Sequence, residues 1–355
     1  MPTVVIAAGG TAGHVVPALA VADALSARGA KIAFIGGERA EAELVPDAGY
    51  PLHSLRVTGI DRRNPFRAAR ALLLAAAATA RARRVLRSLG ADVVLGGGGY
   101  VAGPVGLAAA TLRLPLALSE ADSHLGVANR LLGPLARRTY LAFPLPGRAG
   151  PRYLVTGRPI PAGTGQADRR TARERFGIAV DEQCLLVFGG SLGARRLNDA
   201  ALDAFGPEAP CAVLHASGRR DYDDLRRRLD ALGAPRHYRL HAYIKPFADA
   251  LAAADLVAAR AGGSVLEIAA AGLPAIVIPY PAATADHQTT NARYMERAGA
   301  AVVVKDAELD GPRLAREVSS LLGAPERLAA MRGAARTAAR PDAAERIAED
   351  LLAMA

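Results

Sequence analysis

The feature that most constrains the fold is a pattern that occurs twice in the chain. An apolar run is followed by two glycines, a hydroxyl residue, one spacer, a third glycine and a helix-like segment. It is found at residues 3–20, "TVVIAAGGTAGHVVPALA", and again at 184–202, "CLLVFGGSLGARRLNDAAL". An apolar run ending in glycine is typical of a buried strand of a parallel sheet. Since the pattern restarts, the chain is predicted to contain two such sheets.

Other segments continue this alternation of strands and helices. Apolar runs that end in glycine-rich or polar turns occur at 31–37, 91–104, 115–123, 254–260 and 273–281. Strands alternating with helices predict right-handed βαβ units. The Pro- and Gly-rich stretch 157–166 is interpreted as a linker. We therefore expect two Rossmann-like domains, at residues 1–157 and 164–338, facing each other across a cleft. The final helix, about 340–355, is expected to return to the first domain.

The two glycine turns favour phosphate binding without matching a nucleotide-binding fingerprint. Neither contains G-x-G-x-x-G or G-x-x-x-x-G-K-[ST]. Both nevertheless place glycines before a helix, where backbone N–H groups and the helix dipole favour an anion. One such turn can simply end a strand, but a pair indicates two substrates that carry phosphates, with ligands beyond the carboxyl ends of the strands.

The charge distribution favours an anionic partner. The formal net charge is +10, and the segment from Arg62 to Arg87 holds eight arginines and no acid. Its uncharged core of ten residues is about half of the roughly 20 needed to span a bilayer. The segment therefore suits the surface of an anionic membrane, although it is also compatible with an ordinary arginine-rich surface. Nucleic acid is disfavoured, because aromatic residues make up only 5% and no recognised binding motif occurs.

Cysteine content and the chain start bear on the compartment. Only two cysteines are present, Cys184 and Cys211, which argues against a disulfide framework and a thiolate metal cluster. The amino-terminal residues enter a strand-like run directly, with no basic export signal. A reducing cytosol is the expected environment.

Several motifs together resemble one family. "GGTAGHVVPALAVADAL", "DVVLGGGGYVAGP", "GGSLGARRLN", "RAGGSVLEIAAAGLPAIVIPYP" and "ADHQTTNA" are similar, in the same order, to the MurG family of GT-B glycosyltransferases (family 28). The resemblance covers nearly the whole chain. It implies inverting transfer of N-acetylglucosamine from UDP-GlcNAc to the C4 hydroxyl of lipid I, giving lipid II for peptidoglycan. It also implies a peripheral location on the cytoplasmic membrane face, no cofactor and no metal in the active site.

The same resemblance assigns donor-binding residues to the second domain. Ser191 would contact the donor phosphate, the backbone of Ile244 would read uracil, and Glu267 would hold the ribose hydroxyls. A carboxylate suits a vicinal diol because it accepts two hydrogen bonds. The sugar would meet the loop and the polar side chains at Arg260, Gly263, Ser264, Val265, Leu266, Asp286 and Gln288. The acidic "DYDD" at 221–224 is expected to be a solvated helix face rather than a metal site.

The first domain is expected to hold the acceptor. Thr11, Ala12 and Gly13 would approach its diphosphate with help from Tyr100, and Glu120 and Asp122 are the further acceptor-side candidates. His14 starts a helix and is the natural base for the acceptor hydroxyl, because histidine titrates near neutrality. A role for His14 as a phosphate contact or a structural residue stays open.

Four departures from the family pattern keep the acceptor open. Ala12 replaces a usual glycine, Asp122 replaces an amide, and Pro161 replaces an arginine, although Arg158 is nearby; the donor loop is one residue shorter. The alternatives are a related transferase with another acceptor or UDP-sugar, a non-hydrolysing UDP-GlcNAc 2-epimerase, and a nucleotide-sugar sensor without turnover.

Overall fold

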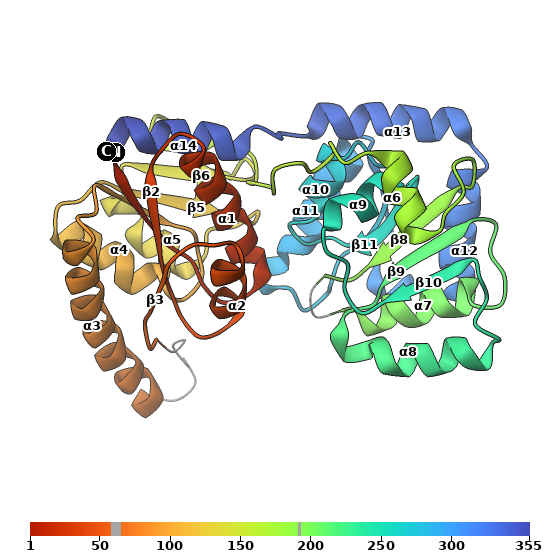
Figure 1. Ribbon diagram of the computed structural model, residues 1–355, viewed down its shortest axis with the longest axis horizontal. Helices are drawn as coiled ribbons and strands as arrows, with labels where there is room; N and C mark the ends of the chain where they lie inside the picture. Colours follow the sequence, from red (N-terminus) through yellow and green to blue (C-terminus); the bar gives the residue numbers. More distant parts are fainter. Residues whose placement is uncertain (58–64, 191–192) are drawn as a thin grey trace. The chain divides into compact units, whose positions relative to one another are not determined.

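A computed structural model describes residues 1–57, 65–190 and 193–355, with the backbone alone for 65–73 and 284. The chain divides into two compact units. Unit 1 comprises Met1–Ala162 and Arg340–Ala355, and unit 2 comprises Gly163–Ala339. Each unit contains one sheet with helices on its faces (Figure 1).

The sheet of unit 1 has seven strands in the order β3-β2-β1-β4-β5-β6-β7, and its described pairs are parallel. The strands are β1 (Thr3–Ala7), β2 (Lys31–Gly36), β3 (Leu52–Ser54), β4 (Val93–Gly96), β5 (Leu116–Glu120), β6 (Arg138–Leu141) and β7 (Tyr153–Val155). The helices are α1 (Ala12–Ser26), α2 (Ala40–Asp47), α3 (Pro65–Ser88), α4 (Ala102–Thr111), α5 (Val127–Leu132), the 3₁₀ turn η1 (Gly133–Leu135) and α14 (Ala343–Met354).

Alternate residues of β1 serve the two faces of this sheet. Val4 and Ile6 belong to the apolar cluster that includes residues of α1, α2 and α14. Val5 and Ala7 belong to the cluster that includes residues of α3, α4 and α5. Both faces are buried, which explains why β1 is a continuous apolar run rather than an alternating one.

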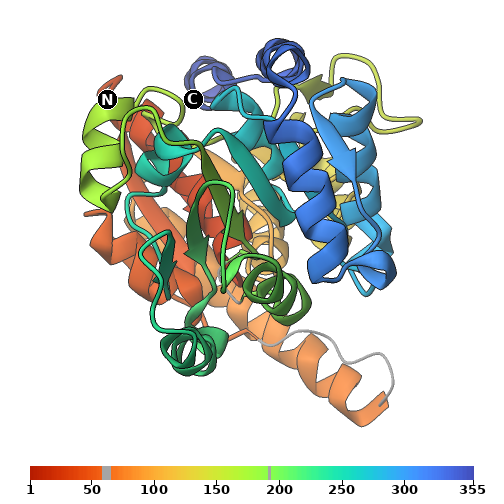
Figure 2. The same cartoon turned by 90° about the vertical axis from the view of Figure 1, so that its right-hand side faces the viewer.

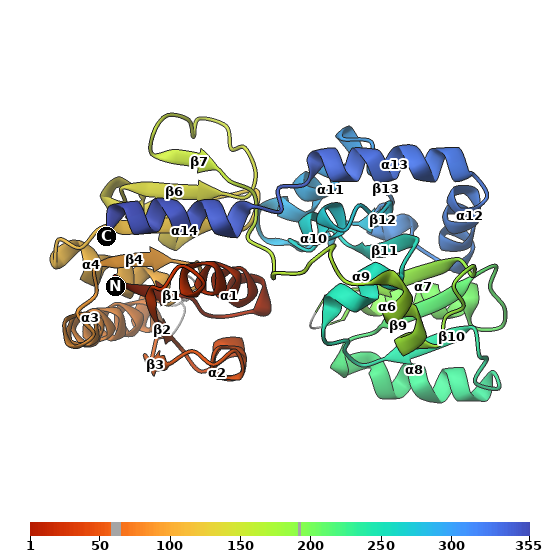
Figure 3. The ribbon, with the colours of Figure 1, turned by 45° about the horizontal axis from the view of Figure 1, so that its top comes forward.

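The carboxyl-terminal helix α14 lies beside α1 in unit 1 (Figure 3). Ile347 and Leu351 are fully buried there. At the edge of this contact Tyr140 Oη donates a hydrogen bond of 2.8 Å to Asp350. Burial of an apolar face therefore holds the end of the chain against unit 1.

The sheet of unit 2 has six strands in the order β10-β9-β8-β11-β12-β13. They are β8 (Cys184–Phe188), β9 (Ala212–Ala216), β10 (Tyr238–His241), β11 (Leu256–Arg260), β12 (Ala275–Ile278) and β13 (Ala301–Val303). The helical segments are α6 (Arg169–Phe176), α7 (Arg195–Phe205), α8 (Arg219–Ala231), α9 (Phe247–Ala253), α10 (Val265–Ala270), η2 (Thr284–Asp286), α11 (His287–Arg297), η3 (Asp306–Glu308), α12 (Gly311–Leu322) and α13 (Pro325–Ala338). Leu197 of α7, Leu225 of α8 and Leu314 of α12 are in one buried cluster.

Two parallel sheets confirm the predicted α/β class with Rossmann-like domains. The two glycine turns, however, are not copies of each other. In unit 1, α1 begins at Ala12, so Gly13 is helical and only Gly10 has a left-handed φ, of +112°. In unit 2, Gly190 and Gly193 have φ of +90° and +76°, and α7 begins only at Arg195. The shared sequence pattern therefore codes for two different turns.

Helix α3 carries part of the arginine-rich segment and packs against α4. Its amino-terminal end extends away from the sheet in Figures 1 and 2. Arg62 and Arg63 lie outside the described residues, whereas Arg81, Arg84 and Arg87 are exposed on α3. In the part of the chain that the structure describes, no helix is both long enough and apolar enough to cross a membrane.

Candidate active site

In both units the glycine turn lies where the strand order reverses. In unit 1 this point is between β1 and β4, and in unit 2 between β8 and β11. Ligands of doubly wound sheets bind at such points, beyond the carboxyl ends of the strands. The turns after β1 and β8, which carry the repeated glycine pattern, are both at these positions.

The structure brings His14 against the turn that follows β4. A Cβ atom on Gly98 would lie 2.6 Å from His14 Cδ2, so a side chain at Gly98 would displace the imidazole. His14 is half-buried, whereas Thr11 and Gly13 are exposed. Thr11 is the N-cap of α1 but its side chain makes no capping hydrogen bond. Thr11, Gly13 and His14 are therefore at least partly accessible at the amino-terminal end of α1.

Ala12 fits this turn because it is the first helical residue of α1. A methyl group is strained only where φ is positive, and the positive φ falls on Gly10 instead. The departure from the family pattern at Ala12 thus carries no backbone cost.

Arg158 supports the same turn through hydrogen bonds to backbone carbonyls. Pro17, within the first turns of α1, has no N–H to donate to the carbonyl of Gly13 four residues earlier. Arg158 takes that place: Nη2 donates to Gly13 O over 2.8 Å, and Nη1 donates to Ala121 O over 3.1 Å. Arg158 is 5% exposed. These two bonds brace the turn.

Tyr100 is joined to the first turn through Glu41, a residue that sequence reasoning missed. Tyr100 Oη donates to Glu41 Oε1 over 3.0 Å, and the amides of Gly10 and Gly37 each donate to the same carboxylate over 2.8 Å. Burial and the bond to Glu41 raise the pKa of the Tyr100 phenol. Its hydroxyl is thus committed within the protein, and its ring is the part that remains for contact.

The third loop of unit 1, after β5, contains the predicted Glu120 and Asp122. Glu120 Oε2 accepts hydrogen bonds from Gly126 N at 2.7 Å and Asn129 Nδ2 at 3.0 Å. Burial raises the pKa of Glu120 to about 6. Asp122 is half-buried, and its amide donates to Glu120 Oε1 over 3.3 Å. Glu120 thus organises the loop that displays Asp122.

The glycine turn of unit 2 rests on a buried polar network. Ser191 lies outside the described residues. His215 is fully buried, with Nδ1 2.7 Å from Tyr238 Oη and Nε2 3.0 Å from Asn198 Oδ1. Burial lowers the pKa of His215 to about 3, so it is neutral. Asn198 Nδ2 in turn donates to Ser217 O, the carbonyl that a Cβ on Gly193 would approach to 2.3 Å.

Asp221 corrects one expectation. The "DYDD" segment at 221–224 was predicted to be a solvated face, but Asp221 is only 4% exposed. It accepts from Asn198 Nδ2 at 3.0 Å and from Arg220 Nε at 3.0 Å. The first acid of the segment thus belongs to the support of the second turn. Within the described residues, no three His, Cys, Asp or Glu side chains gather as a metal site would require.

Arg260, at the end of β11, points into an internal ion pair. Its Nη1 lies 2.5 Å from Asp306 Oδ1, and its Cζ lies 5.6 Å from the centre of the Tyr280 ring. It is 8% exposed. In this arrangement Arg260 holds together the loops after β11, β12 and β13.

The remaining donor candidates surround the loop after β11. Gly263, Ser264 and Glu267 are half-buried, and Val265 and Leu266 are buried, so the latter two offer backbone groups only. Asn291 Nδ2 anchors the loop by donating to Ala261 O over 3.1 Å.

Three candidates lie on other loops of unit 2. Gln288 Oε1 accepts from Tyr280 N at 2.9 Å, and Asp286, with a left-handed φ of +51°, accepts from Thr289 Oγ1. Ile244 is buried in the loop after β10.

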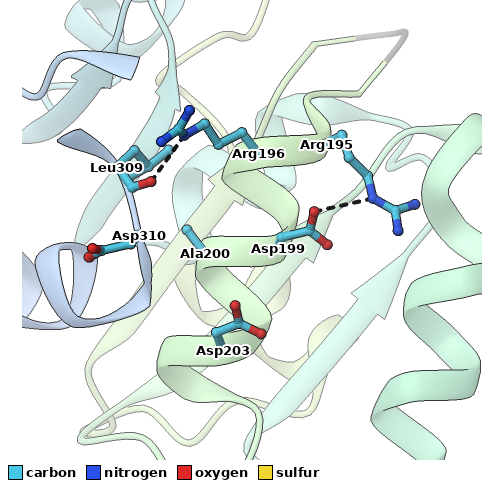
Figure 4. A pocket seen from close by; sticks show the side chains of 7 residues that line it. All are labelled: Arg195, Arg196, Asp199, Ala200, Asp203, Leu309 and Asp310. Atoms are coloured by element: carbon cyan, nitrogen blue, oxygen red, sulfur yellow. Dashed lines mark hydrogen bonds and ion pairs between the residues drawn. The ribbon is translucent and has the colours of Figure 1, made fainter. Parts of the chain in front are cut away.

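A shallow groove beside α7 lies apart from these candidates (Figure 4). Its charged groups are paired: Arg195 Nε lies 3.2 Å from Asp199 Oδ2, and Arg196 Nε donates to Leu309 O over 3.1 Å. Because none of the predicted site residues lines the groove, we assign it no role in the reaction.

Two Rossmann-like units, each with a glycine turn at its switch point, define the GT-B class of glycosyltransferase folds. Residues 4–141 match the glycosyltransferase family 28 N-terminal domain, and residues 184–347 match the family 28 C-terminal domain. The chain belongs to glycosyltransferase family 28.

Individual relatives agree with this assignment. The chain is 42% identical, over 100% of its length and 97% of the relative, to UDP-N-acetylglucosamine–N-acetylmuramyl-(pentapeptide) pyrophosphoryl-undecaprenol N-acetylglucosamine transferase of Salinibacter ruber. The crystal structure of Acinetobacter baumannii MurG is 30% identical with a TM-score of 0.77, covering 99% of this chain and 100% of that one. A UDP-N-acetylglucosamine 2-epimerase is similar in fold alone, with 14% identity and a TM-score of 0.68, over 99% and 96% of the two chains.

Proposed function

We propose that this protein transfers N-acetylglucosamine from UDP-GlcNAc to the C4 hydroxyl of lipid I and so forms lipid II. The observation that carries the proposal is the match over the whole chain to a transferase named for that donor and a pyrophosphoryl-undecaprenol acceptor. The departures at Ala12 and Asp122 do not oppose it, because Ala12 is helical and Asp122 is only half-buried.

Unit 2 would bind the donor. The glycine turn after β8 would offer backbone N–H groups, and α7 would add the positive end of its dipole to the departing diphosphate of UDP. Glu267 would accept the ribose hydroxyls, and Gln288 and Asp286 would meet the sugar. We assign no metal and no cofactor to the reaction, because the amides and the helix dipole supply the stabilisation. Full activity in excess chelator is the expected result.

Unit 1 would bind the acceptor, with the diphosphate at Thr11–Gly13. In a single displacement the acceptor C4 oxygen bonds to the anomeric carbon, the bond to the UDP oxygen breaks, and the anomeric centre inverts. The C4 proton would pass to His14, which the Gly98 contact holds at the start of α1.

A lipid-linked acceptor requires contact with the membrane, and we propose that α3 provides it on the cytoplasmic face. Arg81, Arg84 and Arg87 are exposed on this helix, and the neighbouring α4 exposes 45% of Leu107. Each basic residue near an anionic surface contributes about 1 kcal/mol. Replacing the three arginines by glutamine should reduce binding to anionic vesicles by roughly 100-fold, measured by co-sedimentation.

The deciding experiment incubates the protein with labelled UDP-GlcNAc and a lipid I analogue carrying a short prenyl chain. A disaccharide-linked lipid product that depends on both substrates is expected. Absence of that product at high enzyme concentration would contradict the proposal. Formation of UDP-ManNAc without acceptor would indicate an epimerase instead.

A further inference from the structure

One arginine to which no role has yet been given lies beside the first glycine turn. Arg39 is exposed and is the N-cap of α2, just after the carboxyl end of β2. Its Cζ lies 5.1 Å from the centre of the Tyr100 ring. The next amide, of Ala40, donates to Gly10 O over 3.4 Å. The guanidinium of Arg39 is therefore held next to the turn where unit 1 is proposed to meet a diphosphate.

The ring beneath Arg39 is fixed by a fully buried carboxylate. Glu41, with 0% exposure, accepts the Tyr100 hydroxyl as well as the amides of Gly10 and Gly37. Three donors satisfy its charge within the protein. Glu41 thereby connects the turn after β1, the turn after β2 and the turn after β4.

Two glycines beside this carboxylate leave space for the side chains of Tyr100 and Glu41. A Cβ on Gly37 would lie 2.0 Å from Tyr100 Oη, and a Cβ on Gly9 would lie 2.8 Å from Glu41 Oε1. These two glycines at the ends of different strands are thus accounted for by the side chains of Tyr100 and Glu41.

We propose that Arg39 binds the diphosphate of the lipid-linked acceptor, and that Tyr100 and Glu41 are positioning residues for it. The identity of the anion rests on the proposed function. A guanidinium is planar, so it can stack on an aromatic face and still present N–H donors at its edge to phosphate oxygens. The buried carboxylate sets the ring, the ring sets the guanidinium, and the guanidinium meets the anion beside Thr11–Gly13.

The test compares two charge removals from the two ends of β2. Arg39→Gln removes the cation beside the turn, and Lys31→Gln removes an exposed cation at the first residue of the same strand. Arg39→Gln should raise the KM for the lipid I analogue about tenfold, equivalent to about 1.4 kcal/mol, with the KM for UDP-GlcNAc within twofold. Lys31→Gln should change neither. An unchanged acceptor KM, or an equal rise in Lys31→Gln, would overturn the proposal.

Tyr100 variants test the positioning role. Tyr100→Phe keeps the ring face and loses the bond to Glu41, whereas Tyr100→Leu loses the face. We expect the leucine variant to reproduce most of the rise in acceptor KM, and the phenylalanine variant less. Adding Arg39→Gln to Tyr100→Leu should then cost little more, because interacting residues are not additive. Fully additive losses would contradict a shared role.

Direct binding separates this inference from the proposed function. Inorganic pyrophosphate is titrated by calorimetry into protein saturated with UDP, so that the donor turn is occupied. Arg39→Gln should raise its Kd about tenfold, and Lys31→Gln should not. If the parent protein makes no disaccharide but this difference holds, the function fails and the anion site stands. If turnover is normal and Arg39→Gln changes neither the acceptor KM nor the pyrophosphate Kd, the anion site alone is refuted. It is also refuted if the parent protein binds no pyrophosphate.

A vesicle measurement distinguishes an acceptor diphosphate from lipid headgroups. Arg39→Gln should co-sediment with anionic vesicles as well as the parent protein does. Weaker vesicle binding with unchanged pyrophosphate binding would assign Arg39 to the membrane surface and overturn the proposal.

Discussion

The two glycine turns begin from one sequence pattern and are supported by different side chains. The turn of unit 1 runs directly into α1 and is held by two buried charges, Glu41 at the amide of Gly10 and Arg158 at the carbonyl of Gly13. In unit 2, α7 begins later after the glycine pair, Gly193 has a left-handed φ, and the support is a network in which Asn198 joins the neutral His215 to Asp221. A short glycine pattern thus specifies that a turn follows a strand, whereas packing decides its shape and its electrostatics.

The largest expected effect is on the rate of transfer when His14 is replaced. His14 has no counterpart in the second turn. Loss of a general base typically costs 10²–10⁴-fold in rate, so His14→Ala should lower kcat by about that factor while binding of UDP-GlcNAc is retained. Steady-state kinetics with the lipid I analogue measures it. A near-normal kcat would leave His14 with the phosphate-contact or structural role.

The third glycine of each turn should respond differently to the same change. Gly193→Ala places a methyl at φ +76° and 2.3 Å from Ser217 O, which should cost about 3 kcal/mol or more of unfolding free energy. Gly13→Ala is helical and meets only Thr11 Oγ1 at 3.3 Å, so it should stay within about 1 kcal/mol. Denaturant titration of both variants checks this. Equal losses of unfolding free energy in the two variants would contradict the difference in backbone conformation between the turns.

Removing the charged brace should destabilise unit 1 alone. Arg158→Met leaves the carbonyls of Gly13 and Ala121 without a buried donor, and we expect about 2 kcal/mol of destabilisation. Hydrogen exchange would report it as faster opening of α1, with amides of α7 in unit 2 as the internal control. Unchanged protection of α1 would exclude the brace.

The smallest effect, counted per pH unit, is a pH dependence of opposite sign in the two units. The pKa of Glu120 is raised by burial to about 6 in the folded protein, so unit 1 holds a proton that the unfolded chain releases between about pH 4.5 and 6. Its contribution to stability is therefore lost as pH rises through that range, at up to about 1.4 kcal/mol per pH unit. The pKa of His215 is lowered to about 3, so unit 2 loses stability as pH falls below about 6.5.

Matched glutamine variants isolate these slopes. The stability of Glu120→Gln relative to the parent should improve as pH rises from 4.5 to 6. That of His215→Gln should improve as pH falls below 6.5. The same sign in both variants would contradict the assignment of a buried acid to one unit and a buried neutral imidazole to the other.

Several supporting residues could not be predicted from the sequence, for identifiable reasons. Pro17 does carry a local signal, because a proline in a helix leaves the carbonyl of Gly13 without its partner, but nothing local says that Arg158 will supply the donor. In the sequence Glu41 is one of three nearby glutamates, at 38, 41 and 43, and nothing local distinguishes it from the other two. Asp221 was predicted to be solvated because three of the four residues 221–224 are acidic and a helix rich in arginine follows them. His215 is in an apolar strand, where only Tyr238 and Asn198 from other elements make its burial tolerable.

The sequence by itself determined the two parallel sheets, the places of the glycine turns and membership of the glycosyltransferase family. These follow from apolar runs, glycines and short motifs, all of which are properties of neighbouring residues. Only the tertiary structure decided that the turns differ and which charges brace them. Glu41 and Tyr100 are 59 positions apart, and Arg158 and Gly13 are 145 apart, yet they are in hydrogen-bond contact. Such contacts arise because a parallel sheet brings the carboxyl ends of strands that are far apart in the chain to the same edge, and no local pattern records that.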